Sequence, residues 1–192
     1  PEIKNLSNEN VPHPWFQIDI PIIIGIGRLA HQKDYATLIK AFSIVRKEKV
    51  CKLIIIGEGS ERGKIESLIS KENLKDDIEL MGYQVNPWKY LSKSNLFVLS
   101  SLWEGFGNVI VESMYLGIPV ISTDCPSGPR EILKNGDLGN LVPPADPELL
   151  STEILNFLNF PNENLEKAFK AEKTSLNYLP SRIAQNYSQE LS

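Results

Sequence analysis

Residues 96–112 read LFVLSSLWEGFGNVIVE, and this stretch decides how the chain is organised. Its first part, 96–100, is an apolar run without alternation, which is typical of a parallel strand buried on both faces. Its last part continues to about Leu116 and is apolar on nearly every side, so it predicts a largely buried helix. Glycines between the strand and the helix let a ligand approach the backbone and the free N–H groups of the first helical turn.

Two carboxylates flank these glycines, Glu104 before the helix and Glu112 in its middle. A buried carboxylate needs a partner, because an unpaired buried charge is too costly to keep. Carboxylates accept hydrogen bonds well from vicinal hydroxyls, so a sugar or a ribose is a natural ligand. Alternatively, Glu104 is a helix-start carboxylate favoured by the helix dipole, and Glu112 pairs with a buried Arg. The two together, with the glycines between them, favour the ligand.

Composition limits the class of protein. The chain has 192 residues with 42% apolar content, enough for one well-cored domain. A net charge of −4 with scattered Lys and Arg offers no basic face for nucleic acid. Cys51 and Cys125 are too few for a disulfide framework, so we expect small buried residues in a reducing cytoplasm. We find no signal peptide and no apolar run near the roughly 18 residues of a membrane helix.

Apolar runs alternate with amphipathic segments along the whole chain. Strands are predicted near residues 22–26, 52–57, 78–82, 96–100, 119–123 and 139–143. Buried strands separated by helices predict a three-layer α/β/α, Rossmann-like domain with a parallel sheet of about six strands. Residues 1–20 are Pro-punctuated and predict a linker or irregular N-terminal arm, 21–180 form the domain, and 181–192 predict a C-terminal helix. Because the chain begins with Pro1, we expect it to be a piece of a longer protein.

Several signals fall where the predicted strands end. Residues 25–30, GIGRLA, formally fit the dinucleotide fingerprint, but their first glycine lies within the strand. Arg28 and Lys33 instead indicate that side chains clamp a phosphate, a task that dinucleotide folds leave to backbone N–H groups. Because ligands of parallel sheets bind outside the carboxyl ends of the strands, Gly27, Gly82 and Glu104 are expected to share one crevice.

The E-x7-E spacing from Glu104 to Glu112, the G-R-L…K pattern over 27–33 and the M-G-Y step over 81–83 resemble glycosyltransferase family four. The resemblance extends from about residue 20 to residue 190. In that family, the motifs lie in the nucleotide-sugar-binding half of a GT-B fold. The family usually carries Gly-Gly where this chain has Ser-Gly-Pro at 127–129, a variant that resembles bacterial transferases building surface polysaccharides and lipid-linked glycans.

The resemblance implies a role for each matching residue. The diphosphate would lie on Gly27, Arg28 and Lys33, and the nucleobase on Gly82 and Tyr83. The start of the motif helix would contact the donor, Glu112 would bind the ribose, and Glu104 would act on the donor sugar as the catalytic carboxylate. The residues implied at the helix start are Phe106, Gly107, Asn108 and Val109.

The implied enzyme transfers a sugar with retention from a nucleoside-diphosphate sugar, a UDP-sugar, to a glycan or lipid-linked acceptor. A missing N-terminal domain would bind that acceptor, so this chain alone is expected to be inactive. The helix over 181–192 would either cross to that missing domain or pack on its own domain. No Asp-x-Asp occurs, so we expect neither a metal nor another cofactor, with Arg28 and Lys33 supplying the positive charge. We expect a cytoplasmic protein, and a peripheral position at the inner face of the membrane stays open for the full-length protein.

Other functions remain open on the residues alone. One is an NAD-type oxidoreductase domain in which Glu58 binds the ribose. Another is a non-catalytic interaction module in which both glutamates are structural. A glycoside hydrolase using Glu104 and Glu112 as acid and base is less favoured, because its carboxylates must face each other across a sugar at roughly 5 to 9.5 Å.

Overall fold

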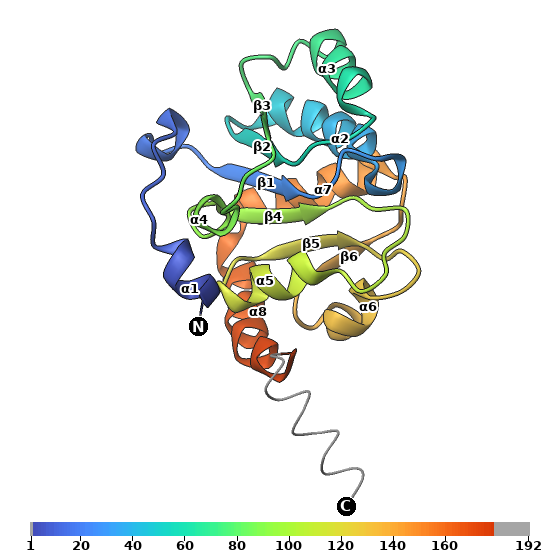
Figure 1. Cartoon of the computed structure of the whole chain (residues 1–192). Coiled ribbons are helices and arrows are strands. Elements are labelled where there is room, and N and C mark those ends of the chain that lie inside the picture. The colour runs from blue at the N-terminus through green and yellow to red at the C-terminus, as the bar shows by residue number, and fades with distance from the viewer. Residues whose placement is uncertain (1, 179–192) are drawn as a thin grey trace, which may run out of the picture.

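The computed structural model describes residues 2–178 and shows a parallel six-stranded sheet between helices (Figure 1). The strands are β1 (Ile22–Ile26), β2 (Lys52–Ile56), β3 (Ile78–Gly82), β4 (Leu96–Leu99), β5 (Val120–Thr123) and β6 (Asn140–Val142). They lie in the order β3-β2-β1-β4-β5-β6, with every neighbouring pair parallel. The predicted three-layer, Rossmann-like fold is confirmed.

The strand order reverses between β1 and β4, which lie side by side at the centre of the sheet. Ile24 pairs with Ile54 of β2 on one side and with Phe97 of β4 on the other. Every residue of β1 is buried, as expected of a strand covered on both faces. Because all strands run in one direction, their carboxyl ends meet at one edge, and the order reversal opens a crevice there.

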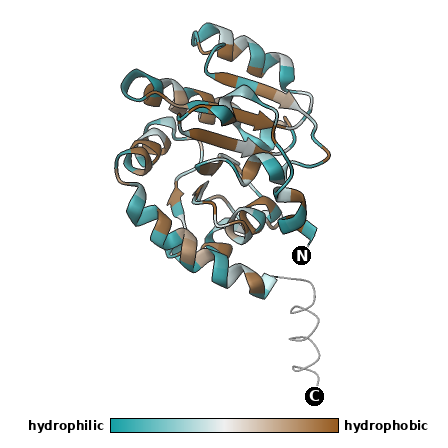
Figure 2. Ribbon diagram, turned by 90° about the vertical axis from the view of Figure 1, so that its left-hand side faces the viewer, coloured by the Kyte–Doolittle hydropathy of each residue, from teal (hydrophilic) through white to brown (hydrophobic). Residues whose placement is uncertain are grey.

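Two apolar clusters hold the helices against the sheet. On one face, α2 (Tyr35–Glu48), α3 (Arg62–Lys71) and α7 (Pro147–Asn159) pack around residues such as Phe42, Ile65 and Ile154. On the other face lie α4 (Trp88–Leu91), α5 (Asn108–Tyr115), α6 (Pro129–Ile132) and α8 (Pro161–Ser175). Figure 2 shows the apolar residues concentrated on the strands and on the helix faces that meet them.

Side chains cap two of the helices, and a third begins without such a cap. Asp34 accepts a hydrogen bond from the Thr37 N–H at 3.3 Å to cap α2, and Asp146 caps α7 through the Leu149 N–H at 2.9 Å. The N-cap of α3 is Glu61, whose side chain forms no cap hydrogen bond. The Glu61 N–H donates to the Leu29 carbonyl at 2.9 Å, which ties the start of α3 to the loop after β1.

The N-terminal arm is more regular than predicted. It contains α1 (Glu2–Ser7) and the 3-10 helix η1 (Pro14–Gln17). The Asn86 side chain donates to the Leu6 carbonyl at 2.8 Å, and the Ser92 hydroxyl donates to the Ser7 carbonyl at 2.9 Å. These bonds tie α1 to the segment around α4. Trp15 and Phe16 pack on the α4 side of the sheet.

The described chain ends in the 3-10 helix η4 (Leu176–Tyr178). The predicted helix over 181–192 lies outside the described residues. Within residues 2–178, no helix is both long and apolar enough to cross a membrane.

Candidate functional site at the carboxyl edge of the sheet

Glycines pack the loops after β1 and β2 tightly together. The Gly27 N–H donates to the Ile56 carbonyl at 3.0 Å, and the Gly57 N–H donates to the Gly82 carbonyl at 2.9 Å. A Cβ at Gly57 would lie 2.0 Å from the Gly27 oxygen, and a Cβ at Gly59 would lie 2.2 Å from the Leu29 oxygen. Both contacts are with backbone that cannot move aside. The loop after β2 thus packs on segments that are distant from it in the sequence.

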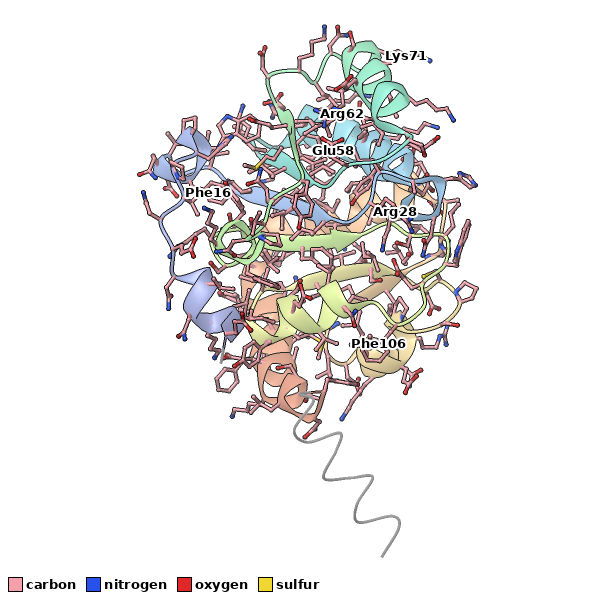
Figure 3. All side chains as sticks on the ribbon, viewed as in Figure 1. Phe16, Arg28, Glu58, Arg62, Lys71 and Phe106 are labelled. Carbon is pink, nitrogen blue, oxygen red and sulfur yellow. The ribbon has the colours of Figure 1, made fainter. Side chains whose placement is uncertain are left out.

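The same loops line a cavity of about 370 Å³. Three of the predicted ligand-binding residues line its wall, namely Gly27, Arg28 and Tyr83, and Glu58 does so too. Gly82 directly precedes Tyr83 and turns the chain with a φ of +70°, a conformation that favours glycine. Figure 3 shows Arg28 and Glu58 on this edge of the sheet, with Phe106 further along it. The structure therefore brings together the residues assigned to the diphosphate and the nucleobase.

Arg28 and Lys33, which the sequence grouped as a phosphate clamp, have different surroundings. Arg28 is exposed, and its side chain forms no hydrogen bond or ion pair with any residue in the range 2–178. Lys33 is at the end of the 3-10 helix η2 (His31–Lys33), and its Nζ lies 2.5 Å from Oε1 of Glu104. The side chains of this pair are only 16% and 7% exposed, respectively. Arg28 is available to an anion, whereas Lys33 already neutralises Glu104.

Buried hydroxyl groups hold Glu104 in place. The Ser101 hydroxyl donates to Oε1 of Glu104 at 2.5 Å, and the Thr123 hydroxyl donates to the Ser101 carbonyl at 2.6 Å. Burial raises the pKa of the nearby Tyr35 hydroxyl, and the negative charge of Glu104 raises it further. Glu104 therefore sits in a dry, hydrogen-bonded environment with Lys33 as its counter-ion. The alternative in which the dipole of the following helix stabilises it does not describe these contacts, because α5 begins only at Asn108.

Glu112 has a partner that the sequence did not identify. The Trp88 indole N–H, on α4, donates to Oε2 of Glu112 at 2.8 Å. The buried Arg considered for this role is wrong, since the bond comes from an aromatic side chain. Burial raises the pKa of Glu112, while the bond from Trp88 acts in the opposite direction. A neutral N–H donor leaves the negative charge uncompensated, so a further donor such as a hydroxyl would be favourable.

The residues implied at the start of α5 surround an open helix end. Gly107 is the N-cap with a φ of +89°, and no side chain caps the first turn. Asn108 is exposed, Phe106 is 43% exposed, and Val109 is partly buried. A Cβ at Gly128 would lie 2.1 Å from the Phe106 oxygen, so this position of the Ser-Gly-Pro variant must remain a glycine. The loop after β5 thus supports the motif.

A second, larger cavity of about 820 Å³ adjoins this loop and was not predicted. The Arg130–Asp124 ion pair and Glu131 line it, and Cys125 borders it with 3% exposure. Burial raises the pKa of the Cys125 thiol. Both cysteines are free and buried, as predicted. In the part of the chain that the structure describes, no three His, Cys, Asp or Glu side chains are grouped to hold a metal ion.

Comparison with known proteins identifies relatives. Residues 16–175 match the family model described as glycosyl transferases group 1. An uncharacterised glycosyltransferase of Methanocaldococcus jannaschii is 46% identical over 135 residues, which cover 69% of this chain and 33% of that protein. An N-acetylgalactosamine-N,N'-diacetylbacillosaminyl-diphospho-undecaprenol 4-alpha-N-acetylgalactosaminyltransferase of Campylobacter jejuni is 34% identical over 148 residues, which cover 77% of this chain and 40% of that protein.

Solved structures show the same fold. A TarM mutant of S. aureus, in complex with fondaparinux, alpha-GlcNAc-glycerol and UDP, matches with a TM-score of 0.80 at 27% identity. The match covers 94% of this chain and 37% of that one. Anabaena HepE in complex with UDP and glucose has a TM-score of 0.84 at 20% identity, covering 97% and 54% of the two chains.

This chain spans 33% and 40% of the length of the two curated relatives. The family match nevertheless extends over most of its residues, in agreement with the fold and with the glycine-lined crevice. The chain belongs to the glycosyl transferases group 1 family.

Proposed function

We propose that this chain is the donor-binding domain of a glycosyltransferase and binds a nucleoside-diphosphate sugar, a UDP-sugar. The observation that carries the proposal is the cavity of about 370 Å³ at the carboxyl ends of β1, β2 and β3, with the unpaired side chain of Arg28 in its wall. TarM, a relative at 27% identity, was solved with UDP and supports the choice of base. The whole protein would transfer the sugar, with retention, to a glycan or lipid-linked acceptor bound mainly by segments outside this chain, in the cytoplasm.

The walls of the cavity suit the parts of a nucleotide. Apolar side chains of Ile26, Ile56 and Pro87, with the ring of Tyr83, offer a surface for a flat base. Arg28 presents a fixed fork of donors that matches the geometry of phosphate oxygens. The uncapped first turn of α5 adds free N–H groups and the positive end of a helix dipole.

The two glutamates would bind the hydroxyl-bearing parts of the donor. Glu112 keeps acceptor capacity beyond its single bond from Trp88, which suits the two hydroxyls of a ribose. Glu104, held by Ser101, would meet the donor sugar and act as the catalytic carboxylate. The positive charge for the diphosphate would come from Arg28, Lys33 and α5, so the proposal includes binding without a metal or another cofactor.

Calorimetric titration of the chain with UDP, GDP and ADP tests this proposal. Because a charge-assisted hydrogen bond contributes about 1.5–3 kcal/mol, Arg28→Ala should weaken the preferred nucleotide about 10- to 100-fold. Binding should persist in excess EDTA and weaken as salt is added. Lys40→Ala is the control, because it removes one positive charge from an exposed position on α2.

Four results would contradict the proposal. Equal affinity in Arg28→Ala and wild type would remove the phosphate role of Arg28. A strict need for magnesium would remove the metal-free diphosphate site. Tight binding of NADH with no binding of UDP, GDP or ADP would favour the oxidoreductase alternative, and failure to bind any of them would favour the interaction module.

A further inference from the structure

One carboxylate oxygen of Glu104 has two donors, and they differ in how firmly they are held. Oε1 accepts from the Lys33 ammonium and from the Ser101 hydroxyl, each at 2.5 Å. The proposed function requires Lys33 to reach the diphosphate and Glu104 to reach the sugar. In this structure, each is engaged with the other. The two residues cannot keep their mutual contact and also bind these two parts of a nucleotide sugar, so one contact must give way when the nucleotide sugar enters.

The Lys33 side chain lies next to the cavity. A Cβ on Gly27, which lines the cavity, would be 3.0 Å from Cε of Lys33, so the lysine stem runs directly over this glycine. Nothing projects from Gly27 to separate the stem from the cavity wall. The lysine side chain is a flexible stem of four carbons. Rotation about its outer bonds can therefore move the ammonium group between Glu104 and the cavity.

The main chain around Lys33 is fixed. The Ser100 hydroxyl donates to the Lys33 carbonyl at 2.7 Å, and the Leu102 N–H donates to the Gln32 carbonyl at 2.8 Å. The Gln32 side chain in turn donates to the Trp103 carbonyl at 2.8 Å. These bonds fasten η2 to the segment after β4 on both sides of Lys33. Only the lysine side chain can change partner without disturbing the loop.

Ser101, in contrast, cannot leave Glu104. It has no exposed surface, and its carbonyl accepts the hydroxyl proton of Thr123, which is also fully buried. Its hydroxyl lies only three residues from Glu104 and donates to the carboxylate within the same short loop. A buried hydroxyl without its acceptor would incur a desolvation cost, so the bond is maintained.

We propose that Lys33 exchanges Glu104 for the diphosphate when a donor binds, and that Ser101 is a positioning residue that keeps the Glu104 carboxylate in place after the exchange. The inference rests on the proposed function and deepens it. Affinity for the diphosphate is set by competition between two anions for one ammonium group. Glu104 then faces the sugar as an ionised carboxylate with one neutral donor.

The exchange predicts that substituting one site residue strengthens nucleotide binding. Glu104→Gln should bind UDP more tightly than wild type, by about threefold to tenfold, because Lys33 no longer has to leave an anion. In a Lys33→Met background, Glu104→Gln should give no gain. Glu163→Gln, on α8, removes the same charge outside these loops and should leave the UDP affinity unchanged. Calorimetry of the four Lys33 and Glu104 combinations gives the coupling between them.

The outcomes separate the possibilities. Unchanged or weaker UDP binding in Glu104→Gln would overturn the exchange and indicate that Lys33 bridges both anions. A gain that persists in Lys33→Met would also overturn it, because general repulsion between Glu104 and phosphate would then suffice. Failure of the wild type to bind any nucleotide would instead refute the proposed function, and the inference with it.

The positioning role is tested by comparing UDP with UDP-sugars. Ser101→Ala should keep the UDP affinity within about twofold of wild type but lose about threefold to tenfold of the extra affinity that the preferred sugar adds. Ser101→Thr, which restores a hydroxyl, should recover it. Ser122→Ala is the matched control, since Ser122 is equally buried and its hydroxyl donates to a carbonyl of its own strand.

A purely structural role gives a different pattern. It would lower the affinity for UDP and UDP-sugar alike and lower the melting temperature, without rescue by Ser101→Thr. That pattern would overturn the assignment. An unchanged ratio of the UDP and UDP-sugar affinities in Ser101→Ala would also overturn the assignment. The same holds if none of UDP-glucose, UDP-galactose and UDP-N-acetylglucosamine binds wild type more tightly than UDP does.

Discussion

The two halves of the carboxyl edge are built in opposite ways. The loops after β1, β2 and β3 meet through glycines, leave a cavity and expose Arg28 without a partner among residues 2–178. The loop after β4 and helix α5 hold their carboxylates in hydrogen bonds, Glu104 with Lys33 and Glu112 with Trp88. In the first half, the absence of side chains on the glycines determines how the loops pack. In the second half, hydrogen bonds between polar side chains determine it. If the proposed function holds, the first half, which would take the nucleotide, is ready to bind, whereas the second, which would take the sugar, must first release a contact.

The largest effect is expected where glycine makes the shape. Gly57→Ala would place a Cβ 2.0 Å from the Gly27 oxygen, so the loops after β1 and β2 must separate. Overpacking against backbone should cost about 3 kcal/mol of unfolding free energy, or about 6–12 °C in melting temperature for a chain of this size. UDP binding should be lost with the cavity. Thermal denaturation and calorimetry measure both.

Gly63→Ala is the matched control. Gly63 lies in α3, and a Cβ there would meet no atom within 4 Å. Alanine should therefore stabilise the helix by about 0.5–1 kcal/mol. If Gly57→Ala were equally well tolerated, the contrast between the two halves would not depend on glycine.

The second-largest effect is expected at Glu112, in the half where polar side chains are hydrogen-bonded. Glu112→Gln should weaken UDP about 10- to 100-fold by removing a charged acceptor for the ribose. It should not lower the stability at neutral pH. Burial raises the pKa of Glu112, so the folded state binds its proton more readily than the unfolded state. The unfolding free energy of wild type should therefore fall, relative to Glu112→Gln, as the pH rises through the raised pKa.

Urea denaturation of both proteins between about pH 4 and pH 7 tests the sign of this difference. A wild type that gains stability over Glu112→Gln as the pH rises would show that the ionised carboxylate stabilises the fold. Glu112 would then belong to the packing of α4 on α5 and not to the ligand.

The smallest effect is expected at the rim of the nucleotide half. Tyr83 is 74% exposed, so Tyr83→Ala should change the unfolding free energy by no more than about 0.5 kcal/mol. If its ring covers the base, UDP affinity should fall about twofold to tenfold, and Tyr83→Phe should retain it. Equal affinity in all three proteins would confine recognition of the base to the backbone around Gly82.

The fold could be predicted because its determinants are local. Buried strands appear as continuous apolar runs such as 22–26, and helix caps such as Asp34 and Asp146 precede their helices directly. The right-handed crossover rule then restricts the sheet order. For the same reason, Gly27, Arg28 and Tyr83 could be placed at one edge, since each follows the end of a strand.

The polar contacts of the site could not be predicted in the same way. Lys33 and Glu104 are 71 residues apart, and Trp88 and Glu112 are 24 apart. Neither separation leaves a periodic pattern in the sequence. Which donor reaches a carboxylate depends on how segments distant in the sequence pack together in the fold. The roles of the individual site residues remain predictions until ligand binding is measured.

The arm has a consequence for anyone who dissects this domain. The carbonyls of Leu6 and Ser7 accept side-chain hydrogen bonds from Asn86 and Ser92, which flank the helix that carries Trp88. A fragment trimmed to start just after α1 would keep its sheet and both apolar clusters, yet it would lose the hydrogen bonds that brace α4 and, with them, support for the contact between Trp88 and Glu112. Trimming for crystallisation or fusion would therefore weaken the proposed binding of a ribose at Glu112. The melting temperature would not reveal this loss, because the sheet and its packing would be intact.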